Sequence, residues 1–170
     1  MNKHVGVRAL LVVTLAMLLV VTGGCGKKKK GITPGIDGAA GGNGNQMSDL
    51  EQEKLLFGKS GLEPVYFDYD SFTLRPDAIA TLNKNAELIK QTSSIAIQVA
   101  GHCDERGTQE YNLALGEKRA QAVRSFLVQA GVAGNRLVTI SYGEECPAVQ
   151  GTGEAVWAKN RRAEFNKATM

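Results

Sequence analysis

The side chains of this 170-residue chain that are best suited to chemistry are concentrated in one short segment, residues 101–108 (GHCDERGT). The segment follows an apolar stretch typical of a strand and precedes a long amphipathic stretch typical of a helix. Polar side chains at the carboxyl end of a strand, beside a helix N-terminus, are where α/β sheets usually place ligand contacts. Three interpretations compete: a metal site, a histidine-activated thiol nucleophile and a binding pocket.

The residue types do not favour the first two interpretations. A metal site needs three or four converging ligands, and beyond the N-terminal stretch the chain offers only one histidine, His102. Cys103 follows His102 directly, and adjacent residues at a strand end point to opposite faces, so the two side chains do not readily form a nucleophile–base pair. The sequence also lacks a GxSxG nucleophile motif. A binding pocket without a metal, a cofactor or catalytic machinery is therefore the favoured interpretation.

The helix after this segment supplies a partner for its acidic residue. On a helical wheel Asn112, Leu115 and Arg119 lie close together, beside the apolar stripe that would face the core. Asp104 and Arg119 are then expected to face one pocket, with the carboxylate suited to an ammonium group and the guanidinium suited to a carboxylate. A structural Asp104–Arg119 ion pair remains the alternative.

Alternating strands and helices must position these residues. Four strands are predicted, with Val65, Phe67 and Tyr69 on one face of the first and Phe165 pointing inward from the last. The first long helix begins at Pro76, and its apolar face is expected to hold Ile79, Leu82, Ala86 and Ile89. The predicted strands cover residues 64–69, 95–100, 136–142 and 162–166, and the predicted long helices cover 76–89 and 109–130.

Four ordered motifs carry a family resemblance. Residues 67–70 (FDYD), 101–123, 141–144 (SYGE) and 157–162 (WAKNRR) together resemble the OmpA-like peptidoglycan-binding domain family. The resemblance implies an α+β fold for residues 61–170: a two-layer βαβαββ domain with a mixed four-stranded sheet and helices packed on one side. It also implies non-covalent binding of the peptidoglycan stem peptide.

The resemblance also implies roles for individual residues. The family holds the amino and carboxyl groups of diaminopimelate with an Asp and an Arg, which match Asp104 and Arg119. The remaining pocket residues of the family map to Arg106, Thr108, Asn112, Leu115, Phe67 and Asp68, with Arg161 as a weaker candidate. The implied partners are peptidoglycan, a TolB-like propeller protein and other components of the Tol envelope and cell-division system. An alternative is a periplasmic scaffold whose main ligand is the TolB-like protein.

Two cysteines of the domain are expected to form a disulfide. Cys103 lies in the loop after the second strand, and Cys146 stands where family members commonly have a basic residue. The family topology makes the two preceding strands neighbours, and the expected compartment is oxidising. The alternative is two unpaired thiols that behave as small hydrophobic residues.

The N-terminal stretch is typical of an exported lipoprotein. Basic residues and an apolar run of roughly 13 residues indicate a signal peptide over 1–24, because a spanning helix needs about 20 apolar residues. The small residues before Cys25 resemble a lipobox, which implies lipidation at that cysteine. Gly26 follows where an Asp would retain the protein at the inner membrane, so outer-membrane anchoring with a periplasmic domain is expected.

The segment between the lipid and the domain is expected to be a tether. Residues 25–60 are rich in Gly and Lys, with a short helix predicted over 48–57. The formal net charge of +3 arises outside the domain, because residues 61–170 hold 12 Lys or Arg and 13 Asp or Glu. The chain therefore lacks the charge pattern of a nucleic-acid-binding protein.

Overall fold

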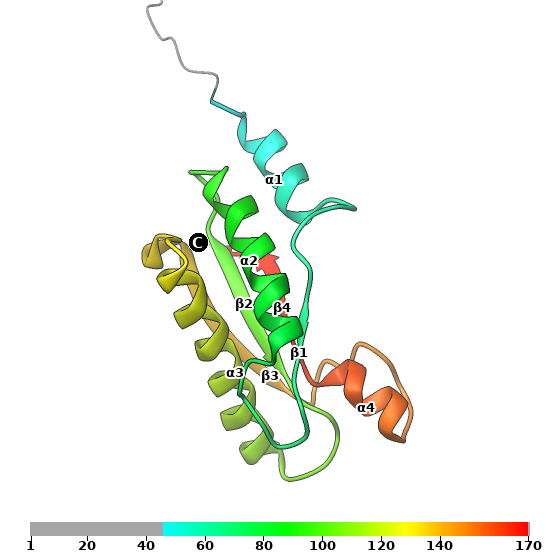
Figure 1. The fold of residues 1–170 in the computed structure, drawn as a ribbon. Helices are drawn as coiled ribbons and strands as arrows, with labels where there is room; N and C mark the ends of the chain where they lie inside the picture. Colours follow the sequence, from blue (N-terminus) through cyan, green and yellow to red (C-terminus); the bar gives the residue numbers. More distant parts are fainter. Residues whose placement is uncertain (1–45, 170) are drawn as a thin grey trace, which may run out of the picture. The chain divides into compact units, whose positions relative to one another are not determined.

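Two long helices, α2 (Pro76–Lys90) and α3 (Gln109–Gln129), pack on one face of a four-stranded sheet in the computed structural model, which describes residues 46–169 (Figure 1). The last strand pairs antiparallel with the first and second, whereas the second and third strands are parallel. This mixed sheet confirms the expected α+β fold. The strands are β1 (Val65–Tyr66), β2 (Ile97–His102), β3 (Leu137–Gly143) and β4 (Arg162–Lys167), in the spatial order β1-β4-β2-β3.

The core lies between the sheet and the two long helices. α2 and α3 each present a stripe of apolar residues at helical spacing, and alternate residues of β2 and β4 meet them from the sheet. Phe165 is buried as expected. The central members of the core are Leu82, Ala86, Ile89, Val99, Val123 and Leu127.

Two residues of the predicted apolar faces are exposed. Tyr69 is 60% exposed because β1 ends at Tyr66 and the chain then leaves the sheet, with the Phe67 N–H donating to the Arg161 carbonyl. Ile79 is 37% exposed because the buried stripe of α2 runs through Ala78 and lies to one side of Ile79. The first predicted strand is thus shorter than expected, and its aromatic end is carried out to the surface.

The short helix α1 (Asp49–Phe57) confirms the helix predicted near the end of the tether. Its N-terminus carries a capping box between Ser48 and Glu51, in which each side chain bonds the other residue's backbone N–H. Leu56 is buried in the core, and the Gln52 side chain accepts hydrogen bonds from backbone N–H groups after α2. The folded unit therefore includes α1 and begins before residue 61, the boundary that the sequence suggested.

The predicted signal peptide, Cys25 and the greater part of the predicted tether lie outside the described residues. Among residues 46–169, no helix combines the length and the apolar character needed to cross a membrane. One further helix, α4 (Glu154–Asn160), was not predicted from the sequence; it lies between β3 and β4.

Candidate functional site

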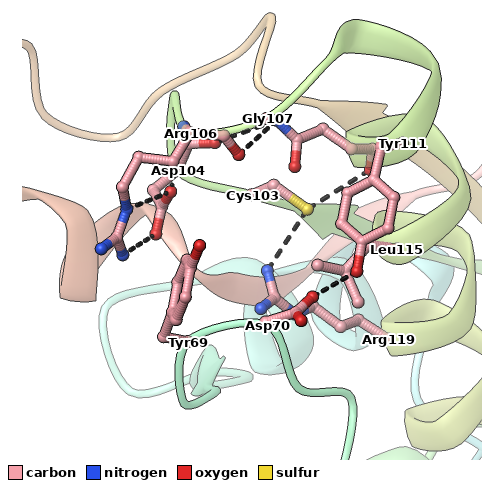
Figure 2. Close-up of a pocket in the computed structure, with 10 residues that line it drawn as sticks. Tyr69, Asp70, Cys103, Asp104, Arg106, Gly107, Tyr111, Leu115 and Arg119 are labelled. Carbon is pink, nitrogen blue, oxygen red and sulfur yellow. Dashed lines mark hydrogen bonds and ion pairs between the residues drawn. The ribbon is translucent and has the colours of Figure 1, made fainter.

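A pocket of about 160 Å³ opens at the carboxyl end of β2, between the loop after that strand, the first turns of α3 and the turn after β1 (Figure 2). Five of the expected site residues line it together, and they come from segments that the fold brings side by side. The pocket is lined by both acidic and basic side chains. The five are Asp104, Arg106, Asn112, Leu115 and Arg119.

Asp104 provides the negative charge of the pocket. Its side chain is 4% exposed, and Oδ2 lies 2.7 Å from Nη2 of Arg106 and 3.2 Å from Nη1 of Arg161. Oδ1 also accepts the backbone N–H of Arg106. Burial opposes ionisation, but the hydrogen bonds from both arginines outweigh it and hold the pKa of Asp104 below its usual value. Asp104 is therefore a carboxylate at neutral pH.

Arg119 provides the positive charge at the base of the pocket, and it is 1% exposed. Its guanidinium donates to the carbonyl oxygens of Ser71 (2.8 Å), His102 (2.7 Å) and Asp68 (3.2 Å). Burial lowers the pKa of Arg119, although arginine stays charged in proteins. All of these backbone partners are neutral, so they fix the guanidinium without neutralising it. The alternative of a direct Asp104–Arg119 ion pair is not realised, because Asp104 is paired with Arg106 and Arg161 instead.

Asn112 and Leu115 shape the wall of the pocket from α3. The buried Asn112 amide donates to the carbonyl oxygens of Asp104 (3.3 Å) and Arg106 (3.2 Å), which fixes the loop on the helix. Leu115 is buried and adds the apolar part of the wall. Gly107 adopts a positive φ of 114°, which favours glycine, and it lets the loop turn into α3.

Three expected site residues support the pocket and do not line it. Thr108 is the N-cap of α3, and its side chain accepts the Tyr111 N–H. Phe67 is buried, with its ring centroid 5.2 Å from Cζ of Arg119. The Asp68 side chain turns away to Arg75, with Oδ1 3.1 Å from Nη1, and only its carbonyl oxygen contacts Arg119.

Sequence reasoning missed several residues at this site. Tyr69, Asp70 and Tyr111 line the pocket, and the Tyr111 hydroxyl donates to Asp70 (Figure 2). The FDYD motif was a signal for the first two, but Tyr69 was placed only on the apolar face of the first strand. Trp157 of α4 was missed because an unpredicted helix carries it.

Arg161 is a support for Asp104. The side chain is buried, and besides Asp104 it donates to the Phe67 carbonyl oxygen (3.1 Å) and to Glu154 (2.5 Å). It does not line the pocket. Arg161 was the weaker candidate for a ligand contact, and in the structure it positions Asp104 from behind the pocket wall.

The expected Cys103–Cys146 disulfide is absent, because both thiols are free in the structure. Cys103 is buried and points towards α3, where Sγ lies 3.3 Å from the Asn112 carbonyl oxygen, whereas Cys146 is exposed. Burial raises the pKa of Cys103 to about 11. The two strands are neighbours as expected, but the side chains face different surroundings.

No group of three or more His, Cys, Asp or Glu side chains within residues 46–169 is arranged to hold a metal ion. The pocket instead joins an acidic group, a basic group and an apolar wall. That combination suits a small ligand, or part of a larger one, that carries both an ammonium and a carboxylate.

Comparisons with known proteins agree with the fold. The model of the OmpA family matches residues 66–161, which include the pocket. The chain is 42% identical to the peptidoglycan-associated lipoprotein of Mesorhizobium japonicum, covering 90% of this chain and 88% of that one. Identity to the peptidoglycan-associated lipoprotein of Pseudomonas aeruginosa is 39%, covering 90% of this chain and 94% of that one.

Solved structures give the same result. The peptidoglycan-associated lipoprotein of Burkholderia pseudomallei is similar with a TM-score of 0.59 and 44% identity, covering 62% of this chain and 89% of that one. The C-terminal domain of Helicobacter pylori MotB is similar with a TM-score of 0.60 and 27% identity, covering 65% of this chain and 87% of that one. The chain therefore belongs to the OmpA family.

Proposed function

We propose that this chain is a non-enzymatic envelope lipoprotein that binds peptidoglycan through the pocket between β2 and α3. The stem peptide enters the pocket with its diaminopimelate side chain. The ammonium group of that residue pairs with Asp104, and its carboxylate pairs with Arg119. A lipid on Cys25 anchors the protein to the outer membrane, so that the domain ties the membrane to the cell wall within the Tol system.

The observation that carries this proposal is the pair of opposite charges in one pocket. Asp104 is ionised and is held by Arg106 and Arg161, whereas the guanidinium of Arg119 donates to carbonyl oxygens and to the Cys103 sulfur, so Asp104 and Arg119 do not neutralise each other. A zwitterionic ligand gains two charge-assisted hydrogen-bonded contacts there. Leu115 supplies an apolar part of the pocket wall for the methylene groups of the ligand.

The ionisation states favour binding over catalysis. A general acid needs a carboxyl pKa raised towards neutrality, whereas the pKa of Asp104 is lowered. A thiol nucleophile needs a lowered pKa, whereas burial raises the pKa of Cys103 to about 11. Asp104 thus stays a carboxylate and Cys103 stays a neutral thiol, which suits a binding pocket.

The relatives support the ligand and the anchoring. Proteins named peptidoglycan-associated lipoprotein are similar to this chain over most of their length. The small residues before Cys25 and the Gly-rich stretch after it suit a lipidated N-terminus followed by a spacer. Full anchoring needs more than one acyl chain, which a diacylglyceryl group on the cysteine supplies.

A sedimentation assay with purified peptidoglycan tests the proposal. The full chain in detergent is compared with Asp104→Ala and Arg119→Met, and with Glu53→Gln, which removes a charge on α1 far along the chain from the pocket. We expect each pocket variant to lose about tenfold or more in affinity, because charge-assisted hydrogen bonds contribute about 1.5–3 kcal/mol, and Glu53→Gln to bind normally. Undiminished binding by both pocket variants would show that the pocket is not the peptidoglycan-binding site.

The chemistry of the cell wall offers a second arm. Peptidoglycan whose stem peptide carries lysine in place of diaminopimelate keeps the ammonium group but lacks the second carboxylate. We expect it to bind wild-type protein more weakly, and we expect Arg119→Met to bind the two polymers equally. Equal binding of both polymers by the wild type would show that the second carboxylate of diaminopimelate does not contribute to binding.

One observation favours a second ligand. Three aromatic side chains, Tyr69, Phe72 and Tyr111, are exposed, and two of them border the pocket. Exposed aromatic residues are common at the centres of protein–protein interfaces. A TolB-like propeller protein is the partner that the family suggests, and it would cover the same surface. Stem peptide should then compete with that protein for the chain, and simultaneous binding of both would separate the two surfaces.

A further inference from the structure

The guanidinium of Arg106 is clamped between two aromatic rings. Its Cζ lies 4.0 Å from the ring centroid of Tyr69 and 4.1 Å from that of Trp157, which come from the turn after β1 and from α4. Trp157 is itself fixed, because its Nε1 donates to Glu105 (3.0 Å). Two rings on a single cation form a cation–π sandwich. Nothing in the function proposed so far requires it.

The same guanidinium donates hydrogen bonds to both oxygens of the Asp104 carboxylate. Nε donates to Oδ1 (3.0 Å) and Nη2 to Oδ2 (2.7 Å), a bidentate pair that uses both carboxylate oxygens (Figure 2). Nη2 also lies 3.8 Å from a Glu154 oxygen. Arg161 reaches only Oδ2, where it supports Asp104 without lining the pocket. Arg106 therefore takes the contacts that an ammonium group of a ligand would need.

We propose that Arg106 is a displaceable internal ligand that fills the cationic half of the pocket until the ammonium group of a bound ligand replaces it on Asp104. The inference rests on the proposed function and adds a regulatory element to the same site. It reverses the role that the family resemblance implied for Arg106, which becomes a competitor of the ligand for Asp104.

The difference between the two arginines on Asp104 explains which one leaves. The Arg106 side chain is 29% exposed, and its other contacts are with two aromatic rings and, at 3.8 Å, with the exposed Glu154 carboxylate. Arg161 is buried and bonded to the Phe67 carbonyl oxygen. The Arg106–Asp104 pair is partly buried, but the guanidinium reaches solvent and its cation–π contacts lie near the surface, where each is weak, so a ligand that replaces it on Asp104 and also binds Arg119 can displace it.

The test uses a tripeptide of the stem peptide that contains diaminopimelate, titrated into the full chain in detergent. Trp157 is the only tryptophan of the sequence, so its fluorescence reports on the clamp directly. We expect the tripeptide to change the Trp157 emission of the wild type as Arg106 leaves the ring. We expect Arg106→Gln to bind about tenfold more tightly, because the ligand no longer has to break the clamp, and to show little change in emission.

Two variants keep this test decisive. Trp157→Leu keeps the charge of Arg106 but removes one ring, so we expect binding about threefold tighter than wild type. Lys90→Gln makes the same charge change as Arg106→Gln on an exposed part of α2, and we expect wild-type binding from it. Thermal unfolding of each variant checks that it is folded, and Trp157→Leu carries the test if Arg106→Gln is not.

Each outcome separates this inference from the proposed function. Binding by the wild type together with weaker or equal binding by Arg106→Gln and Trp157→Leu would overturn the inference and leave the function standing. Binding without any change in Trp157 emission would also overturn it. A wild-type chain that does not bind the tripeptide would overturn both.

Discussion

Gly101 in β2 and Gly116 in α3 are in direct backbone contact. A Cβ atom built on Gly101 would overlap the carbonyl oxygen of Gly116, and one built on Gly116 would come within 2.9 Å of the Gly101 carbonyl oxygen. This approach seats α3 against β2. It thereby fixes the separation between Asp104, which follows β2, and Arg119, which lies one turn beyond Gly116. The two opposite charges of the pocket are thus positioned by two residues that carry no side chain.

Gly101→Ala is expected to destabilise the domain by about 2–3 kcal/mol, because the added methyl group overlaps backbone that cannot move without shifting the helix. Urea denaturation of the full chain in detergent measures the change. Gly134→Ala is the matched control: its Cβ would be no closer than 3.4 Å to its neighbours, and we expect a change within about 0.5 kcal/mol. Equal effects of the two substitutions would contradict the close approach.

Arg161→Met is expected to cost about 2–3 kcal/mol of unfolding free energy, because it removes charged hydrogen bonds from the buried Asp104 and from Glu154. We also expect weaker binding of peptidoglycan, since Asp104 loses a support. Denaturation and sedimentation assays measure the two effects. Arg75→Met removes an exposed pair with Asp68 and Asp77 and should cost less than about 1 kcal/mol. A loss of similar size there would show that burial does not decide the cost.

Glu164 is expected to make stability depend on acidity. Contacts with His102 and Arg162 lower its pKa from 4.5 to about 2 in the folded protein. Because the folded pKa is depressed, its contribution is present above about pH 4.5 and is lost as the pH falls through 2. The side chain is partly exposed, so we expect only about 1 kcal/mol. The free energy of unfolding is measured at pH 7, 4 and 2.5 for the wild type and Glu164→Gln. We expect the wild type to be more stable at pH 7 and the difference to shrink as the pH falls. A difference that does not change with pH would contradict this prediction.

The two domain thiols are expected to react very differently. Cys146 is exposed, whereas Cys103 is buried and its pKa is raised to about 11. Iodoacetamide at pH 8, followed by mass spectrometry of the peptides, should label Cys146 in the native protein and Cys103 only after denaturation. Protection of both cysteines until a reductant is added would instead indicate the disulfide that the structure lacks.

Much of the fold and half of the candidate site could be predicted from local pattern. Helical spacing after Pro76 and after Thr108 located both long helices, and a Ser cap, early acidic residues and a closing Gly58 located α1. Asp104 and Arg119 were placed in one pocket because a strand end and the following helix are joined by a short loop. Such inferences succeed because they depend on residues that are neighbours in sequence.

Burial was harder to predict than helix or strand. Tyr69 was expected on one face of the first strand with Val65 and Phe67, because it continues an alternating pattern. The strand ends at Tyr66, however, and the pattern does not show where a strand ends. The prediction of a Cys103–Cys146 disulfide was wrong for a similar reason. Neighbouring strands place Cys103 and Cys146 in the same region, but the direction of each side chain depends on the packing around it.

The sequence by itself determined the order of the strands, α1 and the two long helices, the family, and the presence of one acidic and one basic group for the pocket. Only the tertiary structure decided that Arg119 keeps an unpaired charge on neutral carbonyl groups and that Arg106 lies on Asp104 between Tyr69 and Trp157. The physical reason is that periodicity and capping act within one element, whereas the carbonyl groups around Arg119 and the rings around Arg106 come from segments far apart in the chain. Their geometry exists only after β4 has inserted between β1 and β2 and brought α4 to the pocket.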